Sequence, residues 1–366
     1  MPDIGKETLK KSTETYFPGI PVVVDCTSLT ESEWHEYRTG GIGGSDAPVV
    51  TGCSPWTTEL ELYHTKIGTP IKYDPDEDKW FIFEFGHVVE DLVAQMFARK
   101  TGFDVFVDTR MYRHPKYSFM QANIDRVVKL PDGRVAILEC KTTTFFNKDA
   151  WFFGPPRYYE MQCRHYMAVC NVDVVYIACL FGNTPADFVC HRIERDFDLE
   201  AELIEAEKDF WENNVLARVE PDYSGDGEKD IEVMRKYGGR ANVSIPPLNL
   251  GPEYLKQAQQ YLAVKEERKR QESVVEALKE REKNLQIPFW EALGTATKGI
   301  VPIHGEEDSY YEVSASPRSR IKTDVDRLKL VYPEAYEDCV TFNEESSRVF
   351  SLTKKRKKKK KGGTAS

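Results

Sequence analysis

Two runs rich in apolar and β-branched residues, 124–130 and 135–140, lie on either side of a Pro-Asp-Gly segment at residues 131–133. Proline presets the first position of a turn and glycine can adopt φ > 0, so the pattern predicts a β-hairpin. The isoleucine, leucine and valine residues of both runs place this hairpin in the centre of a sheet and not at its edge.

The length of the turn sets the pairing register of the two strands. With a two-residue loop, Asp125 lies opposite Cys140. With a three-residue loop that holds Gly133 in a bulge, Asp125 lies opposite Glu139. In this second register Asp125 shares one face with Glu139 and Lys141, because side chains alternate along a strand. Two carboxylates and one ammonium group then meet at one place.

Taken alone, such a cluster fits a half-exposed salt bridge on a sheet surface equally well. Beside a central strand, however, charges need a metal ion or a charged partner to offset their lost hydration. Carboxylate oxygens suit Mg²⁺ or Mn²⁺, and a neighbouring lysine can position an attacking water or help to deprotonate it. The residues Asp125, Glu139 and Lys141 therefore predict phosphodiester hydrolysis.

Periodicity elsewhere predicts a mixed sheet flanked by helices, an α/β (α+β) fold. Helices are predicted at residues 32–38, 54–66, 80–100, 156–170 and 199–215, with a short helix capped by Ser45 and Asp46, and strands at 20–24, 103–107, 110–112, 172–181 and 187–194. An aromatic-rich segment at 145–159 is expected to belong to the core or to a lid on the sheet. Stacking of its rings on unpaired bases is the alternative.

The C-terminal part changes in character after residue 219. Residues 220–249 are rich in Gly, Pro, Asp and Lys, and are expected to form a linker or an irregular excursion. Residues 252–286 are highly charged, which predicts one or two exposed helices that form an arm. A small strand-helix-strand element is expected from the runs at 301–313, 324–332 and 340–352.

The formal net charge of −10 is unusual for a protein that binds nucleic acid. Residues 354–361 carry eight positive charges, so the net −10 becomes −18 for the rest of the chain. An acidic protein can still bind DNA through a locally basic channel, so charge leaves the question open. The basic run is expected to be disordered. Three roles are open for it: an electrostatic contact with DNA, a nuclear localisation signal, or a remnant of cloning.

The eight cysteines include no Cys-x-x-Cys pair, so neither a zinc ribbon, a disulfide scaffold nor an iron–sulfur cluster is expected. No apolar run approaches the ~20 residues that span a bilayer, and the N-terminus lacks the apolar segment of a signal peptide. We therefore expect no membrane association and an intracellular protein in the host cytoplasm. The nucleus is the alternative if the host is eukaryotic and the basic run is native.

Asp125, followed after thirteen residues by Glu139, Cys140 and Lys141, resembles the D…(D/E)xK signature of restriction-endonuclease-like nucleases. On its own this signature has low specificity, because Glu-x-Lys occurs by chance in many chains. Further matches elsewhere in the chain are needed to give it weight.

Three such matches follow in chain order: Arg38 with Gly-Ile-Gly-Gly-Ser-Asp-Ala at 41–47, Gly-His-Val-Val-Glu at 86–90, and Tyr-Tyr leading to Gln and His-Tyr-Met at 158–167. Together they resemble the YqaJ-like viral recombinase family, relatives of the phage lambda exonuclease. The resemblance covers residues 34–221, and more loosely the C-terminal part.

The resemblance implies a restriction-endonuclease-like fold and a Mg²⁺-dependent deoxyribonuclease, with Mn²⁺ as a substitute ion. It implies degradation of linear duplex DNA from 5′ ends, which leaves a 3′ single strand for recombination. The implied metal ligands are Glu90, Asp125, Glu139 and the backbone carbonyl of Cys140; the implied catalytic residues are Asp125, Glu139, Lys141 and Gln162; and Arg38 and Ser45 are expected at the 5′-phosphate.

The family also suggests a homo-oligomer, a trimer by resemblance, and a single-strand annealing protein as a partner. An endonuclease of the same fold is the first alternative and differs only in that it cuts closed circles. A non-enzymatic DNA-binding or scaffold protein is the second, and would tolerate loss of Lys141. The expected domains are a lead-in at 1–30, the nuclease core at 31–219, a linker, arm and small element at 220–353, and the basic tail at 354–366.

Overall fold

The computed structural model describes residues 10–11, 15–72, 80–239, 244–304, 310–315 and 325–339. The chain divides into two compact units, residues 1–240 and residues 241–366. All residues predicted for the site belong to the first unit.

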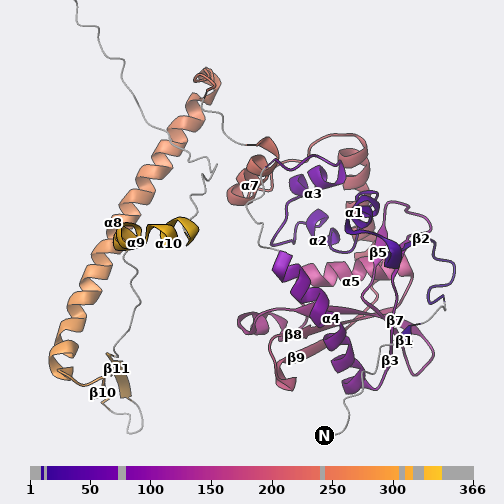
Figure 1. Cartoon of the computed structure of the whole chain (residues 1–366), viewed down its shortest axis with the longest axis horizontal. Helices are drawn as coiled ribbons and strands as arrows, with labels where there is room; N and C mark the ends of the chain where they lie inside the picture. Colours follow the sequence, from indigo (N-terminus) through magenta and orange to yellow (C-terminus); the bar gives the residue numbers. More distant parts are fainter. Residues whose placement is uncertain are drawn as a thin grey trace, which may run out of the picture. The chain divides into compact units, whose positions relative to one another are not determined.

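A six-stranded sheet forms the centre of the first unit (Figure 1). In spatial order its strands are β1 (Lys10–Lys11), β3 (Asp104–Val107), β6 (Arg126–Lys129), β7 (Val135–Thr142), β8 (Val174–Leu180) and β9 (Phe188–Glu194). The β1–β3 and β7–β8 pairs are parallel and the other neighbours are antiparallel. The mixed sheet flanked by helices confirms the predicted fold class.

Strands β6 and β7 form the predicted central hairpin. Gly133 adopts a φ of +87°, and its N–H donates to the carbonyl of Leu130 at 3.0 Å. The N–H of Leu130 in turn donates to the carbonyl of Arg134 at 2.9 Å. The ladder continues this pairing and puts Asp125 opposite Glu139. The three-residue loop is therefore confirmed over the two-residue loop.

Side chains that alternate along these strands enter two separate apolar clusters, one on each face of the sheet. On one face, Phe97 of helix α4 (Trp80–Thr101) joins Leu138 of β7 in a buried cluster. On the other face, helix α5 (Arg157–Cys170) contributes to the cluster that holds Ile137. Because both faces are covered, residues 136–139 of β7 are buried and its other residues are partly buried, as predicted for a central strand.

A smaller antiparallel sheet of three strands completes the β structure of the first unit. Its order is β2 (Val22–Asp25), β4 (Arg110–Arg113) and β5 (Gln121–Asn123). Strands β3 and β4 follow one another in the chain and yet belong to different sheets. A parallel bridge between Ile42 and Met120 joins the glycine-rich loop at 41–44 to the start of β5.

Three short helices precede and follow that loop: α1 (Glu31–Thr39), α2 (Ala47–Val50) and α3 (Glu59–Lys66). Thr30 caps α1 in a reciprocal capping box with Glu33. Helix α3 begins later than predicted, because Thr58 accepts the hydrogen bond that caps its N-terminus.

The segment predicted as a linker at 220–249 contains a regular helix, α7 (Gly227–Gly238), which corrects that expectation. Val233 and Tyr237 of α7 pack with Leu60 of α3 in a small buried cluster. Asp226 caps the helix, so the polar and glycine residues that suggested a linker act here as a helix start. Before α7, α6 (Phe197–Asp209) continues into a π-helical turn (Phe210–Leu216).

The aromatic-rich segment is only partly in the core. Trp151 is buried, at 2% exposure, whereas Phe146 and Phe153 are 93% and 96% exposed. Phe145 and Phe152 are exposed as well. The expectation of a core or lid is therefore confirmed for Trp151 and wrong for the four phenylalanines. Phe145 and Phe146 belong with Trp151 to a 3₁₀ segment (Phe145–Trp151), which turns only one side toward the sheet, and Phe152 and Phe153 follow its end.

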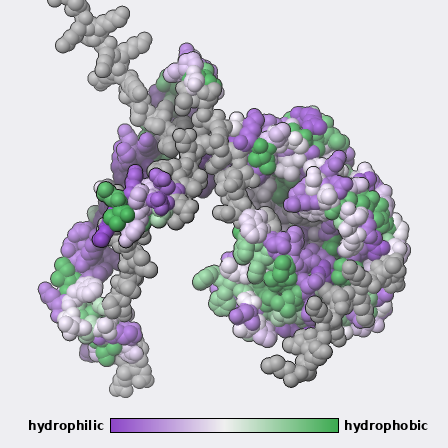
Figure 2. Space-filling view, in the orientation of Figure 1, coloured by the Kyte–Doolittle hydropathy of each residue, from purple (hydrophilic) through white to green (hydrophobic). Residues whose placement is uncertain are grey.

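The second unit consists of a long helix and small appended elements. They are α8 (Leu255–Leu293), β10 (Lys298–Pro302), β11 (Tyr310–Ser314), α9 (Val325–Val331) and α10 (Pro333–Cys339). Helix α8 is one continuous helix with no buried residue among those described, and its surface is mixed in hydropathy (Figure 2). This agrees with the predicted exposed arm. The predicted strand at 340–352 and the basic tail lie outside the described residues.

In the described part of the chain, no helix has both the length and the apolar composition needed to cross a membrane. Seven cysteines of this part, of which Cys163 and Cys170 are examples, are free thiols. Both of these thiols are buried in the core of the first unit.

Candidate functional site

Asp125 lies where the chain enters β6, opposite the second half of β7. Its Oδ2 accepts a hydrogen bond from the backbone N–H of Cys140 at 2.7 Å. In a regular ladder a backbone carbonyl of the neighbouring strand would accept this bond. The N–H and C=O of one strand residue point to the same side, so the Cys140 carbonyl is directed to the same gap as Asp125.

Glu139 is almost completely buried, with its side chain 1% exposed. Its Oε1 lies 2.6 Å from Nζ of Lys141 and accepts a hydrogen bond from Nε2 of Gln162 at 2.6 Å. Its Oε2 is buried without a hydrogen-bond partner among the described residues. The structure thus brings together three residues that the sequence predicted for the site, two from β7 and one from α5.

The charges of this cluster depend on one another. Burial raises the pKa of Glu139 to about 8, the nearby charge of Asp125 adds to the effect, and Lys141 opposes it. Burial alone would lower the pKa of Lys141, but the attraction of Glu139 and Asp125 raises it above the ordinary value. Lys141 is therefore a cation at neutral pH, and its ammonium group lies 4.9 Å from the ring centroid of Tyr159.

Glu90 is held at the site by an arginine from the central hairpin. Arg126 forms ion pairs with Glu90 and with Asp91, both on α4. Burial and the charge of Asp125 raise the pKa of Glu90 to about 7, although Arg126 opposes the shift. Within the described ranges, no group of three or more His, Cys, Asp or Glu side chains is arranged to hold a metal ion. Glu90, one of the predicted ligands, forms an ion pair with Arg126 in this structure.

The donor set of the site nevertheless fits a hard divalent cation. Burial and mutual repulsion raise the pKa values of Glu90 and Glu139, and the buried Oε2 of Glu139 lacks a partner among the described residues. A cation held by Asp125, Glu139 and the carbonyl of Cys140 would relieve the repulsion and satisfy that oxygen.

Arg38 and Ser45 contact each other across the glycine-rich loop. Nη2 of Arg38 donates to Oγ of Ser45 at 2.6 Å. A Cβ on Gly44 would lie only 2.5 Å from the ring of Tyr166, so the loop can pack on α5 only with glycine there. The hydroxyl of Tyr166 accepts a hydrogen bond from Gln162 at 2.9 Å. This chain of contacts links the Arg38–Ser45 pair to the cluster around Glu139.

Sequence reasoning missed the ionic partners of these residues. Arg126 directly follows Asp125, and this adjacency is the only local signal for its role beside Glu90. Lys66 forms a buried ion pair with Asp46 behind Arg38. Nothing in the sequence around Lys66 indicates this partner, because the two residues belong to different helices.

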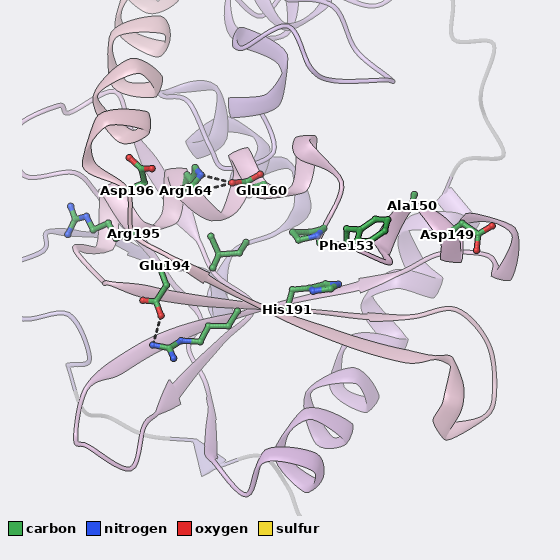
Figure 3. A pocket seen from close by; sticks show the side chains of 13 residues that line it. Asp149, Ala150, Phe153, Glu160, Arg164, His191, Glu194, Arg195 and Asp196 are labelled. Carbon is green, nitrogen blue, oxygen red and sulfur yellow. Dashed lines mark hydrogen bonds and ion pairs between the residues drawn. The ribbon is translucent and has the colours of Figure 1, made fainter.

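A separate cavity of about 710 Å³ lies between α5, β9 and the segment after the 3₁₀ turn (Figure 3). Arg164 and Glu160 of α5 form an ion pair in its wall at 2.5 Å, and Arg192 and Glu194 of β9 form another at 2.7 Å. None of the predicted catalytic residues, metal ligands or 5′-phosphate contacts lines this cavity. It is distinct from the site described above.

Comparisons with known proteins agree with the resemblance noted in the sequence. Two solved structures are similar at low identity. An alkaline exonuclease from Laribacter hongkongensis is 20% identical, over 52% of this chain and 94% of that chain, with a TM-score of 0.42. A phage related exonuclease from Haemophilus somnus 129PT is 14% identical, over 50% of this chain and 99% of that chain, with a TM-score of 0.36.

Sequence similarity is more extensive. The uncharacterized protein YqaJ of Bacillus subtilis (strain 168) is 30% identical over 320 residues, which covers 86% of this chain and 92% of that protein. Residues 33–173 match the model of the YqaJ-like viral recombinase domain. These residues include the Arg38–Ser45 pair and the cluster around Glu139. The chain therefore belongs to the YqaJ-like viral recombinase family.

Proposed function

We propose that this protein is a metal-dependent deoxyribonuclease that acts at the ends of linear duplex DNA. The observation that carries the proposal is the contact of Glu139 with both Lys141 and Gln162, next to Asp125. Two acidic side chains beside a fixed ammonium group provide cation binding and charge stabilisation for phosphodiester hydrolysis. A sheet-surface salt bridge alone would not require a buried carboxylate oxygen without a partner.

Mg²⁺ is the proposed cofactor, with Mn²⁺ as a substitute, and Asp125, Glu139 and the Cys140 carbonyl are the proposed ligands. Glu90 is a further candidate ligand, in exchange for its ion pair with Arg126. When bound, the ion would supply Lewis-acid activation of water and of the scissile phosphate.

The side chains of the site have separate roles in this proposal. Gln162 fixes the orientation of the Glu139 carboxylate through its hydrogen bond to Oε1. Lys141 remains protonated, so it orients the attacking water and stabilises the negative charge that develops on the phosphate, and does not act as a base. The fixed Lys141 ammonium needs no reorganisation when that charge develops.

Arg38 and Ser45 are proposed to bind the terminal phosphate of the 5′ end. A guanidinium group beside a hydroxyl offers several N–H and O–H donors to phosphate oxygens. Binding of a 5′ terminus next to the hydrolytic cluster would give 5′-to-3′ degradation and leave a 3′ single strand for recombination. A trimer around DNA and a single-strand annealing partner are proposals that rest on the family.

The test is incubation of two DNA substrates with Mg²⁺: a linear duplex with 5′-phosphates and a covalently closed circle. EDTA and the Lys141→Ala variant serve as controls. Loss of the linear duplex alone, absent in both controls, supports the exonuclease. Cutting of the circle supports the same-fold endonuclease instead. If neither DNA changes with Mg²⁺ or Mn²⁺, the protein is a binding protein and the proposal is wrong.

A further inference from the structure

A buried ion pair lies directly behind the Arg38–Ser45 pair. Nζ of Lys66, at the end of α3, lies 2.6 Å from Oδ2 of Asp46 and donates to the backbone carbonyl of Arg38 at 3.0 Å. The side chains of Lys66 and Asp46 are 3% and 12% exposed. Lys66 therefore links α3 to the last turn of α1 and to the residue that precedes α2.

Asp46 stands between two cations. Its Oδ2 contacts Lys66 and accepts the N–H of Gly43 at 2.8 Å, whereas its Oδ1 lies 3.7 Å from Nη2 of Arg38. That Nη2 donates to Ser45 instead. Although Asp46 precedes α2, its side chain makes no capping bond to that helix. Its carboxylate thus serves the ion pair and the glycine-rich loop.

This arrangement decides which cation neutralises Asp46. Burial alone would raise the pKa of Asp46, but Lys66, and then Arg38, hold it below its ordinary value, so the group is an anion. With Lys66 as its main counter-ion, Asp46 leaves most of the positive charge of Arg38 available. Without Lys66, the nearest remaining cation is Arg38, and an ionised Asp46 would both bind this arginine and repel an incoming phosphate.

We propose that Lys66 is a positioning residue that compensates Asp46, so that Arg38 and Ser45 remain free to bind the phosphate monoester at a 5′ DNA end. The inference rests on the proposed function and adds a determinant of substrate selectivity to it. Lys66 itself is buried behind the pair and does not contact the DNA. Its effect is therefore on end selectivity and not on the chemistry around Glu139.

The experiment measures binding of short duplexes with 5′-phosphate or 5′-hydroxyl ends by fluorescence anisotropy in EDTA, where no cleavage occurs. For Lys66→Met, which keeps the length of the side chain and removes its charge, the preference for the 5′-phosphate falls by about tenfold, as expected for a charge-assisted hydrogen bond. In Lys66→Met/Asp46→Asn the preference recovers, because the uncompensated carboxylate is gone. Lys66→Arg keeps most of it.

Steady-state kinetics with Mg²⁺ give the second measurement. In Lys66→Met the KM for 5′-phosphorylated ends rises, whereas kcat and the cleavage of 5′-hydroxyl ends stay within about twofold of the wild type. A structural role alone would lower binding and cleavage of both ends equally. If circular dichroism shows that Lys66→Met is unfolded, the same binding and kinetic measurements are made on the double variant and on Lys66→Arg.

Three results overturn the inference. In the first, Lys66→Met loses affinity equally for 5′-phosphate and 5′-hydroxyl ends. In the second, the double variant prefers the 5′-phosphate no more than Lys66→Met does, and in the third the wild type binds both ends equally. Failure of the proposed function differs from all three, since it is the absence of any Mg²⁺- or Mn²⁺-dependent cleavage by the wild type. Selective loss in Lys66→Met with recovery in the double variant supports the inference.

Discussion

The carboxylate of Asp125 accepts the backbone N–H of Cys140 at 2.7 Å and so takes the place of the carbonyl that a continuing β-ladder would supply. Because the partner is backbone, the position of Asp125 does not depend on which side chain residue 140 carries. Strand β6 begins only at Arg126, so no β6 residue pairs with Cys140, whereas β8 pairs with it on the other side. The Cys140 carbonyl therefore faces the gap beside Asp125. The Asp125 carboxylate thereby replaces a ladder carbonyl in the fold and is also a proposed ligand of the metal ion.

Asp125→Asn tests this double role. The amide oxygen can still accept the N–H of Cys140, so we expect the unfolding free energy to change by less than about 1 kcal/mol. Cleavage of linear duplex DNA falls by about 10²-fold or more, because the negative charge is lost. Calorimetric titration with Mg²⁺ and denaturant unfolding measure the two effects. An Asn variant that keeps the wild-type Mg²⁺ affinity would exclude Asp125 as a ligand.

Lys141→Ala removes the charged partner of Glu139. We expect kcat to fall by about 10²- to 10³-fold, as for loss of a fixed group that stabilises charge in the transition state, with duplex binding largely retained. Lys148→Ala is the matched control, since Lys148 pairs with Asp187 near the surface and its loss leaves kcat within about twofold. Equal rates for both variants would show that Lys141 has no part in the chemistry.

Arg126→Met leaves Glu90 partly buried without its cation. Removal of one partner of a buried ion pair costs about 3 kcal/mol of unfolding free energy, which urea unfolding measures. Adding Glu90→Gln recovers part of the loss, because the unpaired charge is gone. Arg134→Met is the control, since the Arg134–Asp132 pair is exposed and its loss should leave stability nearly unchanged. This account would be contradicted if the Glu90→Gln/Arg126→Met variant lost as much unfolding free energy as Arg126→Met alone.

Gly44→Ala pushes a methyl group against Tyr166. The Cβ would lie 2.5 Å from the ring, so we expect a loss of about 1–3 kcal/mol in unfolding free energy and weaker duplex binding through the displaced loop. At Gly154 an added Cβ meets nothing within 4 Å, so Gly154→Ala serves as the control. Thermal unfolding measures the stability of both variants, and titration with duplex DNA measures their binding. Wild-type behaviour of Gly44→Ala would mean that the loop and α5 separate easily.

The buried pair of His165 and Glu207 predicts how stability depends on pH. Nδ1 of His165 lies 2.7 Å from Oε1 of Glu207. Burial opposes the charge of His165, but Glu207 raises its pKa above the ordinary value. Burial raises the pKa of Glu207, with the charge of Asp46 adding to the shift and His165 and Lys66 opposing it. Both shifts mean that the folded pair retains a proton that the unfolded chain releases.

Groups with raised pKa values stabilise the fold at low pH and lose this contribution as pH rises through the folded values. The advantage of the wild type over Glu207→Gln in melting temperature should therefore shrink as the pH rises from about 6. In the variant, burial disfavours charged His165, so its own stability rises over the lower part of this range. A constant or growing difference would show that the pair holds no extra proton.

Some of the site followed from the sequence because its residues are close in the chain. Asp125, Glu139 and Lys141 lie on one hairpin, and turn length and strand alternation together limited their arrangement to two registers. Gln162, Arg38 and Ser45 were named through resemblance, since no local rule connects them to the hairpin. The linker expected before the arm was wrong where α7 forms, because its apolar residues gain their partner only from α3.

The sequence by itself determined the central hairpin, many of the helices and strands around it, and the acidic and basic residues of β7, because these depend on turns, periodicity and alternation within short segments. Only the tertiary structure decided which charges meet. Arg126 pairs with Glu90, and Lys66 with Asp46, across different helices and strands. Such pairs depend on how whole elements pack, and local periodicity carries no information about that packing.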